Sequence, residues 1–283
     1  MVQNLVPLNK RTRVLHYPSA DVPRTRASLG RSPFISKIDL KAGYFNVPLS
    51  PRSARLTTFH APGGRCYWKR MTQGLQNAPA HFQRTMEQVL EGLPVSILLD
   101  DVTCCANDVA QCVQDTVDAI VRLATAGAMI GLYKGIIAAE EVEFMGDWWS
   151  SGGFFRPMVD KVTALLELSE EALSSMHRPQ LYGMLSYWRL YLPDFASRTA
   201  RLRGLLGSDA RSWTPAHTEE VRSALRAIAE GAPAINFDPT APAILEVHAG
   251  PQALSGVLLQ EDTAGKRWLP VATWSRALAG MEG

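Results

Sequence analysis

The sequence predicts an α+β fold, in which helices cover a sheet and a helical segment and further strands follow. Two observations carry this prediction. Short apolar runs bounded by turn residues, at 34–40 and on both sides of Asp100-Asp101, indicate strands. Residues 78–93 and 109–124 repeat apolar side chains at helical spacing, which indicates helices that each bury one face.

The first elements follow from composition and turn residues. The first 36 residues are rich in Pro and Arg and lack a regular period, so we expect a loop with one or two short strands. A strand follows at 34–40. After a turn at Lys41-Ala42-Gly43, the apolar run 44–49 indicates a second strand.

The middle of the chain alternates helices with a hairpin. Asn77 would cap the first helix through its side-chain oxygen, with Pro79 tolerated in the first turn. Asp100-Asp101 is the expected two-residue turn of the hairpin, and Asp108 opens the second helix with a capping-box pattern. The pattern is helical again from 159 to 231. Further strand-like runs lie at 132–138, 142–149, 244–248, 256–259 and 269–272.

Positive charge is concentrated at the start of the chain. The net charge is +2, but the first 75 residues hold thirteen Lys and Arg against two Asp, so that segment is near +11 and the remainder near −9. A polyanion such as nucleic acid is a natural partner for such a segment. Pairing with the acidic remainder of the same fold is the alternative, and charge alone does not decide between them.

The sequence favours an intracellular protein that does not contact a membrane. No run approaches the roughly 20 apolar residues of a membrane span, and the N-terminus lacks the pattern of a secretory signal. The four cysteines show no paired metal-ligand spacing and suit a reducing compartment as buried thiols.

Two adjacent carboxylates in a hairpin turn are unusual, because a neutral Asn-Gly pair would be the easier choice. Asp39 lies near the end of another strand-like run. Three carboxylates that meet at a strand edge would be a suitable cage for a divalent metal. An Asp-Asp pair alone is also typical of a solvated surface turn, so both interpretations stay open at this point.

The order of motifs resembles that of the reverse transcriptases of retroviruses and long-terminal-repeat retrotransposons, the Gypsy type above all. The resemblance covers nearly the whole chain and rests on the segments 8–12, 37–44, 73–83, the Asp100-Asp101 hairpin and 143–146. It implies a right-hand polymerase with an antiparallel palm sheet backed by helices. Fingers and palm would occupy 1–153, with Gly153 at the boundary, a helical thumb 154–236, and a truncated ribonuclease H-like segment 237–283.

The resemblance implies an RNA-directed and DNA-directed DNA polymerase that joins a dNTP to a primer 3′-hydroxyl. Two Mg²⁺ ions would assist, with Mn²⁺ able to substitute. The partners would be an RNA or DNA template with its primer, and dNTPs. The location would be the cytoplasm, a retroelement particle or the nucleus. The alternative function is a catalytically impaired or domesticated copy that binds nucleic acid without polymerising.

The resemblance also implies roles for individual residues. Asp39, Asp100 and Asp101 would be the catalytic metal ligands, and Lys134 would assist the pyrophosphate leaving group. The implied nucleotide-binding residues are Lys41, Ala42, Gly43, Tyr44, Gln73 and Gly74. The implied primer-binding residues are Phe144, Met145 and Gly146, and the nucleic-acid-binding residues are Lys10, Arg11 and Arg13.

Several of these residues have an ordinary structural alternative. Tyr44 is also typical of a core tyrosine and Gln73 of a turn or cap. Lys134 is also typical of a solvated strand end, and 144–146 of an apolar strand. These alternatives stay open on the sequence.

The sequence departs from the family pattern at three positions. Leu98 stands two residues before the aspartate pair, where the family usually has Tyr, so activity or fidelity would be reduced. Val6 stands where Arg is common, and the fingers are expected to be short, so a triphosphate-binding cation would be absent unless Arg11 or Arg13 substitutes for it. His248 stands where the ribonuclease H pattern has its first metal-binding Asp, so we predict no ribonuclease H activity.

Overall fold

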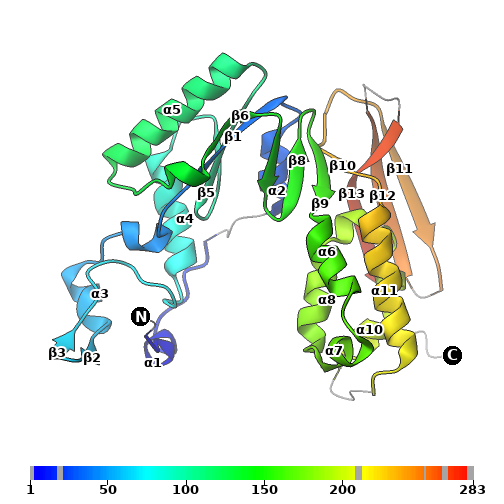
Figure 1. Ribbon diagram of the computed structural model, residues 1–283, viewed down its shortest axis with the longest axis horizontal. Helices are drawn as coiled ribbons and strands as arrows, with labels where there is room; N and C mark the ends of the chain where they lie inside the picture. Colours follow the sequence, from blue (N-terminus) through cyan, green and yellow to red (C-terminus); the bar gives the residue numbers. More distant parts are fainter. Residues whose placement is uncertain (1–2, 18–21, 208–211, 252, 263–266, 279–283) are drawn as a thin grey trace. The chain divides into compact units, whose positions relative to one another are not determined.

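The computed structural model describes residues 3–17, 22–207, 212–251, 253–262 and 267–278. These residues form two compact units, Met1–Val142 and Glu143–Gly283 (Figure 1). Each unit combines helices with antiparallel strand pairs, so the predicted α+β class is confirmed. Within the described ranges, no helix combines the length and hydropathy that a membrane span needs.

The central sheet of the first unit has the strand order β4-β5-β1-β6. Its strands are β1 (Phe34–Asp39), β4 (Val95–Leu98), β5 (Asp101–Ala106) and β6 (Ile136–Ala139). β1 runs antiparallel to β5 in a register that sets Asp39 opposite Asp101. Since β4 and β5 are joined by the hairpin, this register brings the end of β1 beside the hairpin tip.

Helices cover this sheet as their periodicity predicts. α5 (Val109–Thr125) contacts β1, β5 and β6, and α4 (Ala78–Val89) contacts β4; Figure 1 shows α5 lying along the sheet. The Asp108 carboxylate accepts a hydrogen bond from the Gln111 N–H and so caps α5, as predicted. Buried members of the shared core include Ile38, Leu40, Phe82, Met86, Leu90, Val102 and Leu123.

The first segment is more helical than expected. α1 (Val6–Asn9) and α2 (Val22–Leu29) replace the predicted loop with short strands. Each has proline as its second residue, where the fixed φ favours a helix and the missing N–H costs nothing. The predicted strand at 44–49 is also wrong, because a 3₁₀ turn, η1 (Gly43–Asn46), occupies its start. A short apolar run does not distinguish strand from helix.

A small hairpin and a short helix complete the first unit. Ser50 is the N-cap of α3 (Pro51–Leu56), and its hydroxyl accepts a hydrogen bond from the Ser53 N–H at 3.2 Å. β2 (Phe59–Ala61) pairs with β3 (Gly64–Cys66). The Trp68 ring packs near Phe45 and Phe59, with ring centroids 5.6 and 5.9 Å apart. A further 3₁₀ turn, η2 (Leu132–Lys134), precedes β6.

The second unit contains a sheet with the strand order β10-β9-β8-β7. The strands are β7 (Glu141–Phe144), β8 (Asp147–Ser150), β9 (Phe154–Pro157) and β10 (Ala234–Ile235). The predicted single strand at 142–149 is therefore a hairpin. Met145 and Gly146 form its turn with φ values of 55° and 75°, the positive values that a tight hairpin turn needs.

Helices of the second unit confirm the helical pattern expected between 159 and 231. α11 starts at Pro215, and the Thr214 N–H before it donates to His217 Nδ1 at 3.1 Å. The helices are α6 (Val159–Leu166), α7 (Glu170–Ser175), α8 (Arg178–Tyr187), α9 (Phe195–Arg198), α10 (Ala200–Gly204) and α11 (Pro215–Glu230), with the 3₁₀ turn η3 (Arg189–Tyr191).

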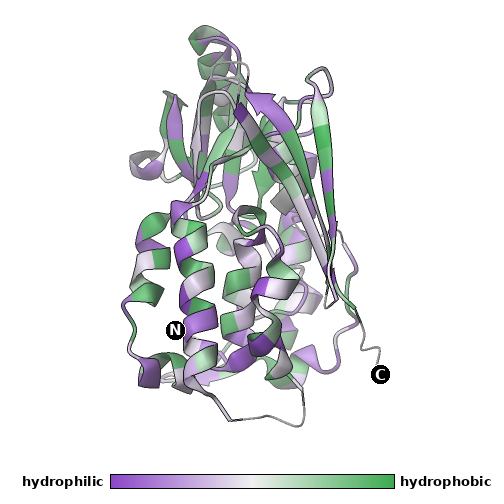
Figure 2. Cartoon of the chain, turned by 90° about the vertical axis from the view of Figure 1, so that its right-hand side faces the viewer, coloured by the Kyte–Doolittle hydropathy of each residue, from purple (hydrophilic) through white to green (hydrophobic). Residues whose placement is uncertain are grey.

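The last sheet has the strand order β11-β12-β13 and confirms the predicted C-terminal strands. They are β11 (Ala243–Ala249), β12 (Ala253–Asp262) and β13 (Arg267–Ala277). Every residue of β11 is exposed, and hydrophobic stretches are visible along these strands in Figure 2. His248 lies in β11 opposite Ser255.

Core packing under α5 gives a direct test of this arrangement. Leu123 is fully buried, whereas Val121 on the same helix is 57% exposed. We expect Leu123→Ala to lower the free energy of unfolding by about 2–5 kcal/mol, because it leaves a cavity against the sheet. The control Val121→Ala should change it by less than about 0.5 kcal/mol. Denaturant titration measures both, and equal losses would contradict the packing of α5.

Candidate active site

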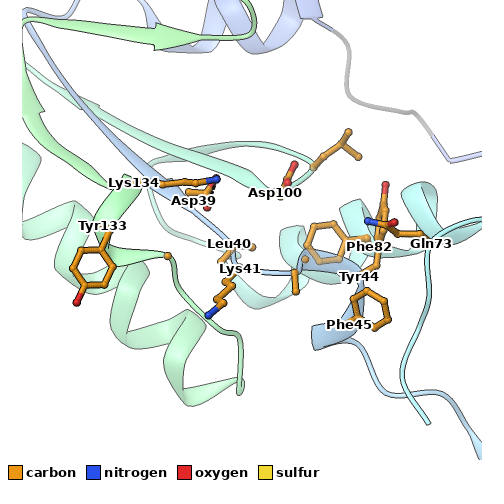
Figure 3. A pocket seen from close by; sticks show the side chains of 14 residues that line it. Asp39, Leu40, Lys41, Tyr44, Phe45, Gln73, Phe82, Asp100, Tyr133 and Lys134 are labelled. Carbon is orange, nitrogen blue, oxygen red and sulfur yellow. Dashed lines mark ion pairs between the residues drawn. The ribbon is translucent and has the colours of Figure 1, made fainter. Parts of the chain in front are cut away.

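A cleft of about 540 Å³ opens where the end of β1 meets the β4–β5 hairpin tip. Figure 3 shows Asp39 and Asp100 together at this point, with Lys134 extending over Asp39. The predicted site residues that line the cleft are Asp39, Lys41, Ala42, Gly43, Tyr44, Gln73, Asp100 and Lys134. The structure thus brings together residues that are up to 95 positions apart in the sequence.

The hairpin turn consists of Leu99 and Asp100, so the predicted Asp100-Asp101 turn is wrong by one residue. Leu98 and Asp101 form the strand pair next to the tip. Leu99 has a φ of 54°, which costs a leucine roughly 1–2 kcal/mol. Asp100 therefore occupies the tip, whereas Asp101 is the first residue of β5.

The carboxylates are held by different partners. The Asp39 Oδ2 lies 4.0 Å from the Lys134 Nζ, and the Asp101 Oδ2 lies 3.2 Å from the Lys37 Nζ. The Asp100 carbonyl oxygen accepts a hydrogen bond from the Leu40 N–H at 3.0 Å. Asp39 and Asp100 line the cleft. Asp101 does not line it, and its carboxylate pairs with Lys37.

Negative charge accumulates at this end of the sheet. Burial raises the pKa of the Asp101 carboxyl above its usual value, the Lys37 ammonium opposes this, and the charges of Asp100 and Asp39 add to the rise. Burial and the nearby Asp100 charge also raise the pKa of the Tyr44 hydroxyl. Both shifts show an environment that disfavours further negative charge, mainly through burial and in smaller part through the neighbouring carboxylates.

The oxygen donors in the cleft suit Mg²⁺, which protein sites usually hold through one or two carboxylates together with water and phosphate oxygens. Asp39 and Asp100 provide such carboxylates. Among the described residues, no group of three or more His, Cys, Asp or Glu side chains is arranged to hold a metal by itself. The donors fit an Mg²⁺ site that substrate and water complete, and the ligation by Asp101 stays a prediction.

Two glycines allow the segments around the cleft to approach each other. A Cβ on Gly131 would lie 2.8 Å from the Asp39 Oδ2, and one on Gly43 would lie 3.2 Å from the Phe82 ring. The Gly131 N–H donates to the Asp39 carbonyl oxygen at 2.8 Å. This bond anchors the η2 loop to the end of β1 and so brings Lys134 over the cleft.

The nucleotide-binding candidates lie on two loops at the cleft. Ala42 adopts a φ of 55°, and the Tyr44 ring packs edge-on against Phe82 with centroids 5.4 Å apart. Gln73 lines the cleft, and Gly74 next to it has a φ of 87°. The Asn9 side chain donates to the Gly74 carbonyl oxygen at 2.8 Å and so holds this loop.

The basic candidates Lys10, Arg11 and Arg13 are exposed and do not line the cleft. Arg13 lines a second depression together with Asn77. Asn77 precedes α4 but its side chain does not cap it, contrary to the prediction. Instead, it accepts from the Leu15 N–H at 3.0 Å and donates to the Arg13 carbonyl oxygen at 2.9 Å.

The primer-binding candidates lie around the β7–β8 turn of the second unit. The Phe144 side chain is 1% exposed and belongs to the core, so its ring does not face solvent. Met145 and Gly146 form the turn itself. Tyr187 lies close to this turn, since a Cβ on Gly146 would be 3.2 Å from its hydroxyl oxygen. The turn backbone is therefore the part that remains available to a ligand.

Sequence reasoning missed two residues that shape the cleft, Gly131 and Gln83. Gln83 lies on the buried side of α4, where its amide bonds to the hairpin backbone at Ile97 and Leu99. The sequence does indicate that Gln83 is unusual, because it is a polar residue on the apolar face of the helix, three positions before Met86. No local pattern marks Gly131.

A family model described as "Reverse transcriptase (RNA-dependent DNA polymerase)" matches residues 1–148. This chain belongs to the reverse transcriptase family. A second model, described as an RNase H-like domain found in reverse transcriptase, matches residues 213–283. The resemblance inferred from the motifs is thereby confirmed for the family.

Curated relatives of this reverse transcriptase chain include retrotransposon polyproteins of the fission yeast Schizosaccharomyces pombe. The Transposon Tf2-3 polyprotein is 26% identical over 283 residues, and the Tf2-7 polyprotein is 25% identical. Each alignment covers 99% of this chain and 21% of the polyprotein. The chain thus spans about a fifth of the length of these relatives, which are of the predicted Gypsy type.

Solved structures share the fold of this reverse transcriptase chain. The foamy viral protease-reverse transcriptase dRH in complex with double-stranded DNA matches with a TM-score of 0.81 and 22% identity, over 97% of this chain and 48% of that one. The foamy viral enzyme in complex with an RNA/DNA hybrid matches with a TM-score of 0.80 and 21% identity, over 99% and 38%. The predicted right-hand polymerase fold with an RNase H-like segment is confirmed.

The raised pKa of Asp101 predicts that this site lowers the stability of the fold. The folded protein binds the carboxyl proton more tightly than the unfolded chain, so ionisation destabilises the fold as pH rises above the ordinary value of 3.8. We expect Asp101→Asn to raise the free energy of unfolding at pH 7. The gain should shrink as pH falls and vanish below 3.8.

Denaturant titrations across pH measure this gain. The matched control is Asp118→Asn, because Asp118 is an exposed carboxylate on α5. A variant that is less stable than wild type at pH 7 would show that the Lys37 pair outweighs the cost of burial.

Proposed function

We propose that this reverse transcriptase chain is an RNA-directed and DNA-directed DNA polymerase that joins dNTPs to a primer 3′-hydroxyl. The observation that carries the proposal is the meeting of Asp39 and Asp100 in one cleft, beside the loops that hold Tyr44 and Gln73. Membership of the family supports DNA polymerase activity in general.

In this proposal the carboxylates hold divalent metal. Bound Mg²⁺, for which Mn²⁺ can substitute, supplies Lewis-acid chemistry at the primer hydroxyl and at the triphosphate. Asp39, at the end of β1, and Asp100, at the hairpin tip, would hold the ions, and Asp101 would contribute from the first residue of β5. The anchored ends of β1 and the hairpin keep the two carboxylates in place before substrate arrives.

The other cleft residues would bind and orient the nucleotide. Tyr44 packs against Phe82, so its ring is fixed and can obstruct a 2′-hydroxyl on the incoming sugar. Gln73 would contact the nucleotide or template, with Lys41, Ala42, Gly43 and Gly74 forming the surrounding backbone. Lys134 has a side chain 77% exposed, which leaves its ammonium free to reach a pyrophosphate leaving group.

Residues outside the cleft would also contact the template and primer. The exposed Lys10, Arg11 and Arg13 belong to the basic first segment and suit a phosphate backbone. The β7–β8 turn at Met145 and Gly146 would contact the primer. We assign fingers and palm to 1–153, thumb to 154–236 and a ribonuclease H-like segment to 237–283.

A second candidate is nucleic-acid binding without catalysis. The pairing of Asp101 with Lys37 favours it, because that carboxylate does not face the cleft in this arrangement. Salt-sensitive binding of a primer–template without extension would support this candidate, and failure to bind any duplex would contradict both.

Primer extension on RNA and DNA templates tests the proposed activity. We expect wild type to extend with dNTPs and Mg²⁺, and Asp39→Asn and Asp100→Asn each to lower the rate by at least about 1,000-fold, because the metal-holding charge is lost. The control Asp118→Asn makes the same chemical change on the exposed side of α5 and should extend at the wild-type rate. No extension by wild type in Mg²⁺ or Mn²⁺ would contradict the proposal.

Sugar discrimination tests the role of Tyr44. We expect Tyr44→Ala to raise the ratio of kcat/KM for a ribonucleotide to that for the matching deoxynucleotide by at least about tenfold, which corresponds to about 1.4 kcal/mol. The control Tyr44→Phe keeps the ring against Phe82 and should keep the wild-type ratio. If Tyr44→Ala discriminates between the two nucleotides as well as Tyr44→Phe and wild type do, the Tyr44 ring only packs against Phe82 and does not select the sugar.

A further inference from the structure

Gln83 links α4 to the hairpin tip that carries Asp100. Its side chain is buried, with 3% of the residue exposed, and it does not line the cleft. The Leu99 N–H donates to the Gln83 Oε1 at 2.9 Å, and the Gln83 Nε2 donates to the Ile97 carbonyl oxygen at 2.9 Å. One amide thus contacts the backbone on both sides of Leu98.

The orientation of this amide is determined by its neighbour on the helix. The Gln83 Nε2 also donates to the Glu87 Oε1 at 2.9 Å, and an ionised carboxylate can only accept. The Nε2 must therefore face Glu87 and Ile97, which leaves the Oε1 for the Leu99 N–H. The Tyr17 hydroxyl bonds to the other oxygen of Glu87 and so connects the N-terminal segment to this set of contacts.

The hairpin tip needs such a contact because Leu99 adopts a conformation that leucine disfavours, with a φ of 54°. On one side of the tip, the Leu40 N–H holds the Asp100 carbonyl oxygen. On the other side, Gln83 holds the Leu99 N–H. If Leu99 relaxed to a right-handed conformation, the next residue would turn and the Asp100 carboxylate would leave its place beside Asp39.

We propose that Gln83 is a positioning residue for nucleotidyl transfer, whose amide keeps Leu99 left-handed and thereby aims the Asp100 carboxylate into the cleft. The inference rests on the proposed polymerase function. It assigns Gln83 no contact with substrate or metal.

The test compares Gln83→Met with a rescue variant. Methionine keeps the length of the side chain and removes both hydrogen-bonding groups, so kcat for primer extension should fall by at least about tenfold, and amide hydrogen exchange at Leu99 should accelerate by at least about tenfold. Adding Leu99→Asn should restore kcat by at least about threefold, because asparagine adopts positive φ more readily. A role in core stability alone would not be rescued at position 99.

Controls separate the possible failures. Gln88→Met makes the same change at an exposed position of α4 and should behave as wild type. Glu87→Ala, at another exposed position, removes the group that orients the amide, and should lower kcat by about threefold and accelerate exchange at Leu99 even where Gln83→Met does not fold. Wild-type kcat and exchange in Glu87→Ala or Gln83→Met, or no rescue by Leu99→Asn, would overturn the inference.

Failure of the proposed function is distinguishable from failure of this inference. A wild-type chain that extends no primer would contradict the polymerase proposal and, with it, the catalytic half of the inference. Exchange at Leu99 needs no catalysis, so it still shows whether Gln83 holds the tip. Slow exchange in wild type that is lost in Gln83→Met would support the contact, and unchanged exchange would overturn it.

Discussion

The antiparallel register between β1 and β5 is the constraint on which the site depends. It sets Asp39 opposite Asp101 and leaves Asp100 at the tip immediately beyond. Because strand side chains alternate between faces, a slip of one residue would move Asp39 to the other face of the sheet. Ser36 and Ile38, two positions apart on one face and both buried, oppose this slip, because it would put Lys37 and Asp39 in their places in the core. The packing of the sheet and the placement of the carboxylates therefore require the same strand register.

Bringing these carboxylates together opposes folding. Lys37 and Lys134 offset part of the repulsion, whereas the pKa of Asp101 is raised mainly by burial, with smaller contributions from the charges of Asp100 and Asp39. A bound cation would lower the remaining repulsion between these carboxylates. Backbone strain adds to this cost at Leu99 and Ala42, which both line the cleft and have positive φ. The proposed active site thus lowers the stability of the fold because it buries charge, which is a common stability–activity trade-off.

The sequence predicted most regular elements but not the contacts between them. The period of the apolar residues in α4 and α5, and the strand at β1, follow from local pattern, and the structure agrees to within a few residues. The hairpin turn was placed one residue late, because aspartate is a better turn residue than leucine. The positive φ of Leu99 depends on Gln83, which comes from a helix 16 positions earlier.

The family resemblance found the candidate site residues, whereas their grouping needed three dimensions. Asp39, Asp100, Tyr44 and Gln73 line one cleft, as their proposed shared role requires. Asn77 shows what local rules miss: it precedes α4 as a capping residue would, yet its side chain holds the N-terminal segment. Such long-range hydrogen bonds leave no periodic signal, so a pattern that is correct about the helix can be wrong about the side chain.

The hydrogen bonds of Asn9 and Asn77 determine where the positive charge of the N-terminal segment lies. The proposed substrates, a dNTP and a primer–template, are polyanions, which the carboxylates at the end of β1 would repel. Asn9 and Asn77 attach the basic N-terminal segment to the loop that carries Gln73 and to the start of α4. The positive charge of this segment is thus fixed near the loop that borders the cleft. Steering by these cations would act over about 10 Å at moderate salt, whereas in the proposed function the carboxylates would act on the substrate through metal at contact distance. Attraction and chemistry are therefore divided between separate groups, which explains how an acidic site can serve anionic substrates.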